Sequence, residues 1–500
     1  MDNHDTLAKL IAARHPCLFI STYEEAHVLG LIDRFASDTS ADFWLWKMNG
    51  GLRVGWLAEA SDPATGNAAA ALYELSQKRG DRNGVTVFID LVQHLEDART
   101  LRLLRDAIEQ HQQGGETLIL LDHSDKLPAV IGAYATRHEV ALPDETQLRQ
   151  IVRDTLKGSH RKAAIKIKAT KRDMSVIVKN LRGLNRRQAA QIIADTVAED
   201  RQFTADDINH VLAAKRHALR SDGLLEYIET PTDLSQVGGI RRLKLWLEQR
   251  QLSDSDSAVA FGLSAPRGVL LLGVQGAGKS LCAKAIATAW QRPLLRLDPG
   301  ALYDRYVGES ERRLRASLHQ AETMAPTVVW IDEIEKGFAS AASRSTDGGL
   351  SQRMFGRLLT WMQDHEEPVF LVATANDIEA LPPELLRKGR FDEIFFVDLP
   401  TVAARREIFK IHLSKRGREP DKFDLNTLIE ATRGYSGAEI EQGIVAALHE
   451  AFAEKTDIDT RRVLKTLSGS PPLSITMAER VGALRRWAQG RCVPADGRDF

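Results

Sequence analysis

The sequence predicts an α/β protein in which a parallel sheet is followed by a small helical subdomain. From about residue 230, short apolar runs alternate with helical patterns: RGVLLLG (267–273), TVVWIDE (327–333) and PVFLVATAN (368–376). Continuous apolar runs of this length are typical of strands buried on both faces of a parallel sheet. After about residue 401 the pattern becomes helical, as in SGAEIEQGIVAALHEAF, which predicts helices behind the sheet.

The first 220 residues follow the same order in weaker form. CLFIST (17–22), TVFIDL (86–91) and TLILLDHS (117–124) have the composition of buried strands, and RGLNRRQAAQII then resembles the later RGYSGAEIEQGI. A matching order of signals in two stretches of one chain indicates an internal repeat of two related modules. The alternative is that two unrelated α/β domains look alike at this level.

The repeat suggests a division of the chain. We expect residues 1–222 to form the first module, with a helical part at about 145–220. Residues 223–400 would form the second sheet domain, 401–465 its helical subdomain, and 466–500 a last helix and tail. In that helix Thr476 and Glu479 have capping-box spacing, and apolar residues recur on one face, which predicts docking onto the sheet domain.

Composition excludes several classes of protein. With 67 basic and 68 acidic side chains the net charge is −1, so no overall field draws the chain to nucleic acid or membrane. The three cysteines (Cys17, Cys282 and Cys492) lie far apart without CxxC spacing, which argues against a disulfide framework or a zinc site. The polar start MDNHDTLAKL and the lack of a long apolar run predict a cytoplasmic protein without membrane insertion.

One motif points to phosphate binding. GVQGAGKS, 273–280, fits the pattern G-x-x-x-x-G-K-[ST], with a strand before it and a helical pattern after it. Glycines let backbone N–H groups turn inward, and the following helix N-terminus favours negative charge. Lys279 would reach the β and γ phosphates of ATP, and the Ser280 hydroxyl would bind Mg²⁺. The phosphate-binding candidates are Gly273, Gly276, Ala277, Gly278, Lys279, Ser280 and Leu281.

Carboxylates follow a second strand at a suitable distance. VVWIDE places Asp332 and Glu333 at the carboxyl end of a strand, where ligands of open α/β sheets bind. Asp332 would hold Mg²⁺, and Glu333 would polarise the water that attacks the γ phosphate. Asn376, which ends the next strand, is a candidate partner of that water; the alternative is an ordinary turn-forming asparagine.

Taken together, these motifs resemble a known family. VGGI (237–240), GVQGAGKS, YVGESE, VVWIDE, VATAND, LLRKGRFDEIFFVDLP and GYSGAEI occur in the order found in the AAA clade of AAA+ ATPases. The resemblance covers about residues 230–450, and it is greatest to stand-alone two-module ATPases of bacteria and plastids. It implies an α/β fold with a P-loop AAA+ module, made of a parallel sheet and a helical lid, after a degenerate AAA-like module.

The resemblance also implies roles for residues outside the phosphate motifs. Gly238, Gly239, Ile240, Gly437 and Ala438 would surround the adenine. His412 would contact the ribose, or it is an ordinary surface histidine.

The resemblance further implies contacts between subunits and with a substrate. Arg387 and Arg390 occupy arginine-finger positions, which act on the ATP of a neighbouring subunit and so require a ring, hexameric in this family. Tyr306 and Val307, in DRYVGESE, occupy the position of the family's central-pore loop. An aromatic ring there grips a threaded chain by contact area alone. The alternative is a tyrosine packed on its own domain.

The first module lacks this chemistry. Where a P-loop would follow its first strand, STYEEA has no lysine and places Glu24 and Glu25 where phosphates would lie. Its second strand ends in FIDL, so Asp90 is kept but Leu91 stands in place of the catalytic glutamate. We therefore expect this module to bind no nucleotide.

A basic segment lies between the modules. Residues 157–187 contain eleven Lys or Arg and one acid, which indicates either a patch that binds RNA or an acidic partner, or a solvated helical face. No HExxH motif occurs, so a metalloprotease is not expected. The sequence predicts an ATPase that remodels or threads a macromolecule, with protein as the favoured substrate class. Two alternatives stay open: a nucleotide-switched assembly scaffold, and a motor directed by RNA or DNA.

Overall fold

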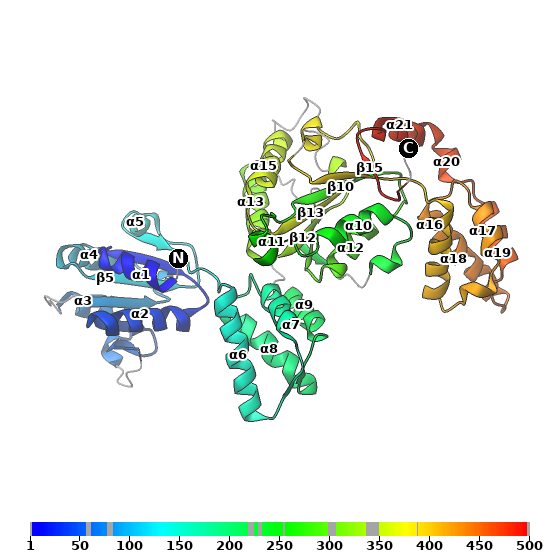
Figure 1. Cartoon of the computed structure of the whole chain (residues 1–500). Helices are drawn as coiled ribbons and strands as arrows, with labels where there is room; N and C mark the ends of the chain where they lie inside the picture. Colours follow the sequence, from blue (N-terminus) through cyan, green and yellow to red (C-terminus); the bar gives the residue numbers. More distant parts are fainter. Residues whose placement is uncertain are drawn as a thin grey trace. The chain divides into compact units, whose positions relative to one another are not determined.

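The computed structural model of the chain divides into two compact units (Figure 1). Unit 1 contains Met1–Pro143 and Asn185–Arg187, and unit 2 contains Asp144–Leu184 and Gln188–Phe500. Most of the segment at about 145–220, assigned to the first module from sequence, thus groups with unit 2. The functional domain boundaries stay predictions. The structure describes residues 3–56, 62–77, 84–218, 225–228, 233–253, 256–298, 307–336, 350–387 and 389–497.

Unit 1 is built on a six-stranded sheet of order β3-β2-β4-β5-β1-β6, in which only the β2·β3 pair is antiparallel. The helices α1 and α2 pack on one face, and α3 and α4 on the other. The strands are β1 (Cys17–Ser21), β2 (Asp42–Lys47), β3 (Gly51–Val54), β4 (Gly84–Ile89), β5 (Thr117–Asp122) and β6 (Thr136–His138). The helices are α1 (Asn3–Ala12), α2 (Glu25–Thr39), α3 (Ala68–Gln77), α4 (Ala98–Gly114) and α5 (Ala129–Gly132).

Unit 2 contains a seven-stranded sheet of order β15-β14-β10-β13-β12-β11-β9, parallel except at β9. The strands are β9 (Leu225–Ile228), β10 (Gly268–Gly273), β11 (Leu294–Leu297), β12 (Thr327–Ile331), β13 (Val369–Ala375), β14 (Glu393–Val397) and β15 (Val493–Pro494). Every residue of β10, β12 and β13 is buried, as expected from their apolar runs.

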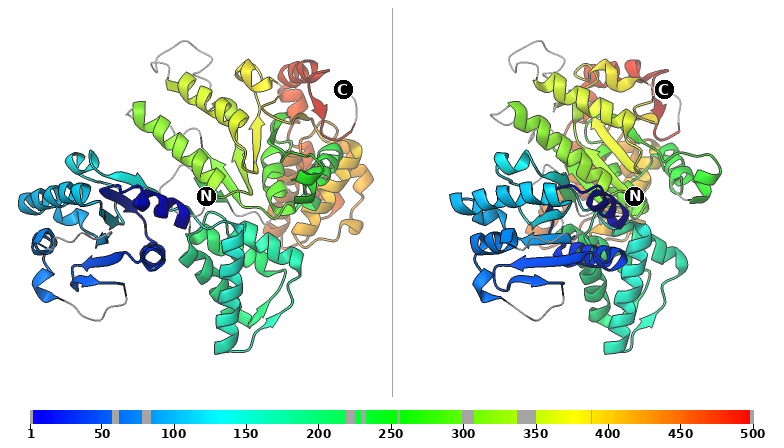
Figure 2. Two further views of the ribbon diagram at one scale, coloured as in Figure 1. Left: turned by 60° about the vertical axis from the view of Figure 1, so that its left-hand side comes forward. Right: turned by 90° about the vertical axis from the view of Figure 1, so that its left-hand side faces the viewer.

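Helices cover both faces of this second sheet (Figures 1 and 2). On one face, α10 (Arg241–Arg250) and α12 (Lys279–Ala289) share a core with β10 and β13. On the other, α13 (Val307–Thr323) and α15 (Leu350–Asp364) bury leucines and methionines against β12 and β13. The short helix α11 (Asp256–Ala260) follows α10 along the chain.

The two sheets have the same topology in their parallel parts. In each sheet, five parallel strands counted along the chain lie in the order second, third, fourth, first, fifth: β2-β4-β5-β1-β6 and β11-β12-β13-β10-β14, with β15 added beside β14 in unit 2. Such an order requires several crossovers in the same arrangement, which is improbable for unrelated sheets. The shared strand order agrees with the internal repeat predicted from the sequence, which stays a prediction.

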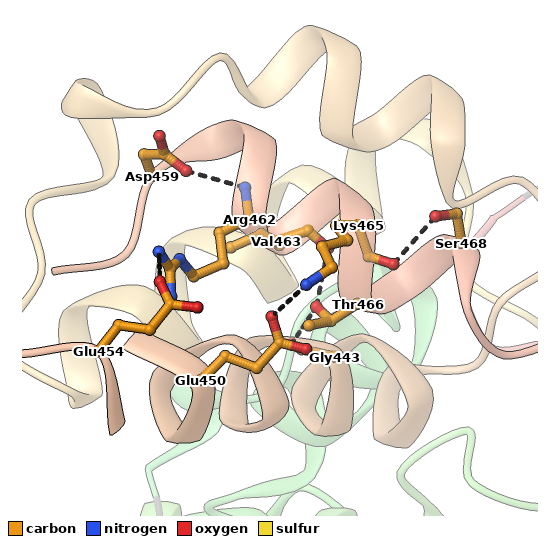
Figure 3. A network of polar contacts seen from close by, with 9 residues as sticks. All are labelled: Gly443, Glu450, Glu454, Asp459, Arg462, Val463, Lys465, Thr466 and Ser468. Atoms are coloured by element: carbon orange, nitrogen blue, oxygen red, sulfur yellow. Dashed lines mark hydrogen bonds and ion pairs between the residues drawn. The ribbon is translucent and has the colours of Figure 1, made fainter. Parts of the chain in front are cut away.

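The helical lid follows the second sheet and is coloured orange in Figure 1. Its helices are α16 (Val402–Lys415), α17 (Leu425–Ala431), α18 (Gly437–Ala453) and α19 (Thr460–Ser468). Two ion pairs connect α18 and α19: Arg462 to Glu454 at 2.6 Å, and Lys465 to Glu450 at 3.0 Å (Figure 3). A side chain at Gly443 would overlap Leu467, so the glycine allows the close approach of these helices.

A second helical group in unit 2 consists of α6 (Glu145–Lys162), α7 (Lys171–Asn180), most of α8 (Arg186–Asp200) and α9 (Asp207–Ala218), with a short β7·β8 pair (Lys166–Ile167, Gln202–Phe203). Two contacts connect it to the sheet domain. The Asn180 amide donates to the Gln291 carbonyl at 3.2 Å, and Arg182 pairs with Glu367 at 2.7 Å.

The C-terminal helix docks as predicted, but its cap differs. In α21 (Ala478–Ala488), Val481 and Leu484 are buried, and Leu484 packs in the core shared with α15. The expected capping box is wrong, because Thr476 ends a separate short helix, α20 (Leu473–Thr476), and the N-cap of α21 is Met477, without a side-chain hydrogen bond.

Candidate functional site

The glycine-rich loop 274–278 lies between β10 and the N-terminus of α12. Gly276 and Gly278 have φ angles of +73° and +93°, in the left-handed region that favours glycine. A side chain at Gly276 would also meet the Ser436 hydroxyl at 3.0 Å. The loop therefore needs glycine at both positions, and it leaves the first N–H groups of α12 available to an anion.

Lys279, the first residue of α12, is buried and folds back onto its own loop. Its Nζ donates to the carbonyl oxygens of Gly273 and Val274, at 2.9 and 2.8 Å. Burial lowers the pKa of Lys279 to about 8, although the Glu335 and Asp332 carboxylates oppose that shift. The ammonium is therefore held only by neutral carbonyl oxygens, which are weaker acceptors than the phosphate oxygens that would replace them.

Asp332, directly after β12, connects three segments. Its Oδ1 accepts hydrogen bonds from the Ser280 hydroxyl at 2.9 Å and the Thr374 hydroxyl at 2.6 Å. A hydroxyl and a carboxylate this close provide the hard oxygen ligands that Mg²⁺ prefers, so the donor set fits the ion. Thr374, in β13, was missed by the sequence analysis because a threonine within a strand has no distinguishing signal.

Glu333 and Asn376 meet at the ends of neighbouring strands. The Asn376 amide donates to Glu333 Oε1 at 2.7 Å, and Thr374 accepts the Glu333 backbone N–H at 3.0 Å. Glu333 has a φ angle of +48°, an uncommon conformation for a residue with a side chain. This backbone conformation and the amide together fix the carboxylate beside the P-loop.

Glu335 was also missed. It is 4% exposed and accepts the Asn376 backbone N–H at 2.8 Å, and burial raises the pKa of its carboxyl. Its only sequence signal is a third carboxylate in IDEIE. Through this hydrogen bond Glu335 holds the backbone of Asn376 in position.

Apart from Glu335, these groups line one cavity of about 370 Å³. It contains the P-loop from Gln275 to Leu281, Asp332, Glu333, Thr374 and Asn376, with Ile408, Ile411, His412, Gly437, Ala438 and Glu441 from the lid. The Ala438 N–H donates to the Gly276 carbonyl at 3.1 Å, which joins the lid to the loop. Burial lowers the pKa of His412, which lies 3.3 Å from Glu441.

A second cavity of about 350 Å³ adjoins the first and shares Gly238, Ala277, Ile408 and Gly437 with it. Gly239 and Ile240 also line it. A side chain at Gly238 would overlap Ile408, so this wall is bare backbone. The segment expected to surround adenine thus lies next to the phosphate cavity, in an arrangement that a base, ribose and triphosphate could span.

Comparison with known proteins identifies the family. Residues 269–399 match the model "ATPase family associated with various cellular activities (AAA)", residues 3–140 the "SpoVK-like AAA ATPase, N-terminal domain" and residues 146–222 the "SpoVK-like AAA ATPase, second domain". The uncharacterized AAA domain-containing protein ycf46 of Guillardia theta is 33% identical over 96% of this chain and 93% of its own length. The chain belongs to the AAA ATPase family.

Two further relatives agree with this assignment. The ycf46 protein of Pyropia yezoensis is 34% identical over 96% of both chains. The proteasome-activating nucleotidase of Saccharolobus solfataricus is 35% identical over 46% of this chain and 60% of its own. The protein is therefore a nucleotide-binding AAA ATPase that hydrolyses ATP.

The two candidate finger arginines of this AAA ATPase differ in their surroundings. Arg387 is exposed. Arg390 is 9% exposed and donates to the Glu384 carbonyl of its own domain, and burial lowers the pKa of its guanidinium. Tyr306 lies outside the described residues, as does the side chain of Val307, whose backbone begins α13.

In unit 1, the corresponding sheet edge is closed by an internal ion pair. Glu24, after β1, accepts from the Arg186 backbone N–H and from its guanidinium, both at 2.7 Å, and the two side chains are 8% and 16% exposed. In the repeat, Arg186 corresponds to Gly437 at the start of α18. A carboxylate paired with an arginine thus follows β1, whereas the phosphate-binding loop follows β10.

The strand ends of unit 1 also differ from those of the ATPase domain. Asp90, with a φ angle of +55°, lies 3.1 Å from His123 Nδ1, and this hydrogen bond raises the pKa of His123. Leu91, in place of a catalytic glutamate, is buried.

Two remaining sequence features concern the chain as a whole. Cys17 and Cys282 are buried, and burial raises the pKa of each thiol to about 12. Among the described residues, no helix is both long and apolar enough to cross a membrane.

Proposed function

We propose that this AAA ATPase hydrolyses Mg²⁺-bound ATP in the cavity at the ends of β10, β12 and β13. We propose further that a homo-hexameric ring in the cytoplasm uses the cycle to remodel or thread a protein. The observation that carries the active site is the Glu333–Asn376 hydrogen bond beside the P-loop. Similarity to a proteasome-activating nucleotidase supports a protein as the substrate class.

Each residue then has one task in hydrolysis. Lys279 exchanges the carbonyls of Gly273 and Val274 for phosphate oxygens, because an ammonium pairs more strongly with an anion than with a neutral acceptor. Ser280 and Asp332 hold Mg²⁺, which neutralises phosphate charge when bound. Glu333 accepts a proton from the attacking water, and Asn376 keeps the carboxylate aimed at it.

The exposed Arg387 supplies positive charge to the ATP of the next subunit. Arg387→Ala should therefore leave nucleotide affinity nearly unchanged and abolish turnover in the ring. Mixing Arg387→Ala subunits with Glu333→Gln subunits should restore partial activity, because some interfaces then combine an intact finger with an intact carboxylate. Full activity of Arg387→Ala alone at all protein concentrations would refute a finger acting between subunits.

The substrate class is tested by stimulation of hydrolysis. We expect an unfolded polypeptide to raise the ATPase rate of the intact chain, and Tyr306→Ala to remove this stimulation while basal hydrolysis and assembly persist. Tyr306→Phe is the matched control, since it keeps the aromatic side chain. Stimulation by RNA, through the exposed lysines of 157–187, would indicate a nucleic-acid motor. Stimulation by neither polymer would favour an assembly scaffold.

A further inference from the structure

Near the end of the described part of the chain, residues 493–496 return to the sheet of unit 2. Val493 and Pro494 form β15, which pairs in parallel with β14 opposite Phe395 and Phe396. The Ala495 N–H continues this pairing to the Phe396 carbonyl at 2.9 Å. We call residues 493–496 the tail strand. It extends the sheet on the side next to β14, at the carboxyl end where the nucleotide cavities lie.

The tail strand is held there by the segment expected to contact adenine. The Ala495 carbonyl accepts the N–H groups of Arg242 and Leu243, at 3.0 and 3.2 Å, in the first turn of α10. These residues follow Gly238–Ile240 after a single intervening residue, Arg241. The tail therefore completes the N-terminal hydrogen bonding of α10, which Ile240 begins without a side-chain cap.

Asp496 connects the tail strand to the lid. Its Oδ2 accepts the Thr401 hydroxyl at 2.8 Å, and its Oδ1 lies 3.3 Å from the Arg241 N–H. Thr401 is the N-cap of α16, the lid helix that also carries Ile408 and His412. One carboxylate thus joins the start of α10, the start of α16 and the end of the chain.

A second contact brings α21 to the same place. Arg485 makes two parallel hydrogen bonds with Asp398, at 2.8 and 2.9 Å, in the loop after β14. Arg485 and Asp398 both line the second cavity. Since Leu484 and Ala488 are buried in the sheet domain, the helix fixes where the tail strand begins.

The second cavity is where these elements meet. Pro494, Ala495 and Asp496 line it from one side, and Gly238, Gly239 and Ile240 from another. Its walls are mainly apolar and backbone, which suits a planar heteroaromatic ring with polar edges. The adjoining cavity, with the P-loop, suits the triphosphate.

We propose that the tail strand is a wall of the base pocket and positions the purine base of the bound nucleotide. The tail strand is therefore a positioning element for ATP. This inference rests on the proposed nucleotide site. It predicts that loss of the tail strand weakens contacts to the base and leaves contacts to the phosphates in place.

The test compares two ligands on the full chain, ATP and inorganic tripolyphosphate, by titration calorimetry. A chain that ends after Cys492 should bind ATP at least ~10-fold more weakly, with tripolyphosphate affinity changed less than ~2-fold. A chain that ends after Gly497 keeps all the contacts described above and serves as the matched control. It should bind both ligands like the intact protein.

A point variant provides a second test in case the truncated chain fails to fold. Asp496→Ala should weaken the binding of ATP more than the binding of tripolyphosphate. Asp496→Asn, which keeps an acceptor oxygen, should recover most of the lost ATP affinity. Equal losses for the two ligands would overturn the inference, because a tail that only holds the fold lowers both affinities together. Unchanged ATP affinity in both variants would overturn it as well. If the intact chain bound no ATP, the proposed nucleotide site itself would fail.

Discussion

In the sheet of unit 2, a lysine, a hydroxyl, two carboxylates and an amide converge at the ends of β10, β12 and β13. In the sheet of unit 1, with the same strand order, Glu24 occupies the corresponding place and is paired with Arg186. The topology places residues at a common edge in both sheets. The sign of the charge after the first strand decides whether the edge accepts an anion.

The comparison also shows how the sheet edge of unit 1 is stabilised without phosphate-binding residues. A nearly buried anion without a partner would destabilise the fold, and Arg186 supplies both a backbone N–H and a guanidinium to Glu24. After β4, Asp90 has an uncommon backbone conformation similar to that of Glu333, yet it faces a histidine where Asp332 faces the Ser280 hydroxyl. The edge of unit 1 therefore satisfies its own charges internally.

The largest expected effect distinguishes the strand end at Glu333 in unit 2 from the strand end at Asp90 in unit 1. Glu333→Gln should bind ATP and hydrolyse it at least ~100-fold more slowly, because proton acceptance is lost while the phosphate loop stays. Asp90→Asn, at the corresponding strand of unit 1, is the matched control and should not change the rate. Steady-state phosphate release measures both. A normal rate in Glu333→Gln would remove the active-site assignment.

The next prediction concerns stoichiometry. The intact chain should bind one ATP, and Lys279→Ala should lose measurable binding altogether, since no second site in unit 1 replaces it. Calorimetry and the ATP-dependent rise in unfolding temperature report both values. If Lys279→Ala still binds ATP with clear stabilisation, the edge of unit 1 is a nucleotide site after all.

The Glu24–Arg186 ion pair should contribute to the stability of unit 1 and not to ATP hydrolysis. Arg186→Gln should lower the free energy of unfolding of this unit by about 2 kcal/mol, because the Glu24 carboxylate stays nearly buried without its cation. Hydrogen exchange at the amides of β1 and β4 follows unit 1 specifically. The double variant Glu24→Gln, Arg186→Gln should lose less than the single one. A double variant that loses as much would mean that packing, and not charge, matters here.

The smallest effect is a proton count at Lys279. Burial lowers the pKa of this lysine to about 8 in the free protein, and bound phosphates should raise it again. ATP binding should therefore take up a fraction of a proton near pH 8.5 and almost none near pH 7, where the lysine is already charged. His412 does not contribute in this range, since burial lowers its pKa from 6.5. Calorimetry in buffers of different ionisation enthalpy measures the uptake, and proton release at pH 8.5 would contradict the assignment.

The sequence by itself determined six central strands, β1, β4, β5, β10, β12 and β13, and the motifs at their ends. A run such as TVVWIDE fixes both a buried strand and the edge at which Asp332 and Glu333 emerge, because the chain leaves the apolar core where the apolar residues stop. The P-loop needs only local glycines and one lysine. The absence of both after β1 was enough to predict an edge without phosphate chemistry in unit 1.

Only the tertiary structure decided which distant groups complete each edge. Arg186 meets Glu24 across 162 positions, and Thr374 and Glu335 support Asp332 and Asn376 through side chains that carry no motif. The tail strand depends on a free edge at β14 and on the packing of α21, neither of which leaves a local pattern in the sequence. Spacing along the chain determines which residues emerge together at a strand end, whereas contacts between remote segments depend on how their surfaces pack.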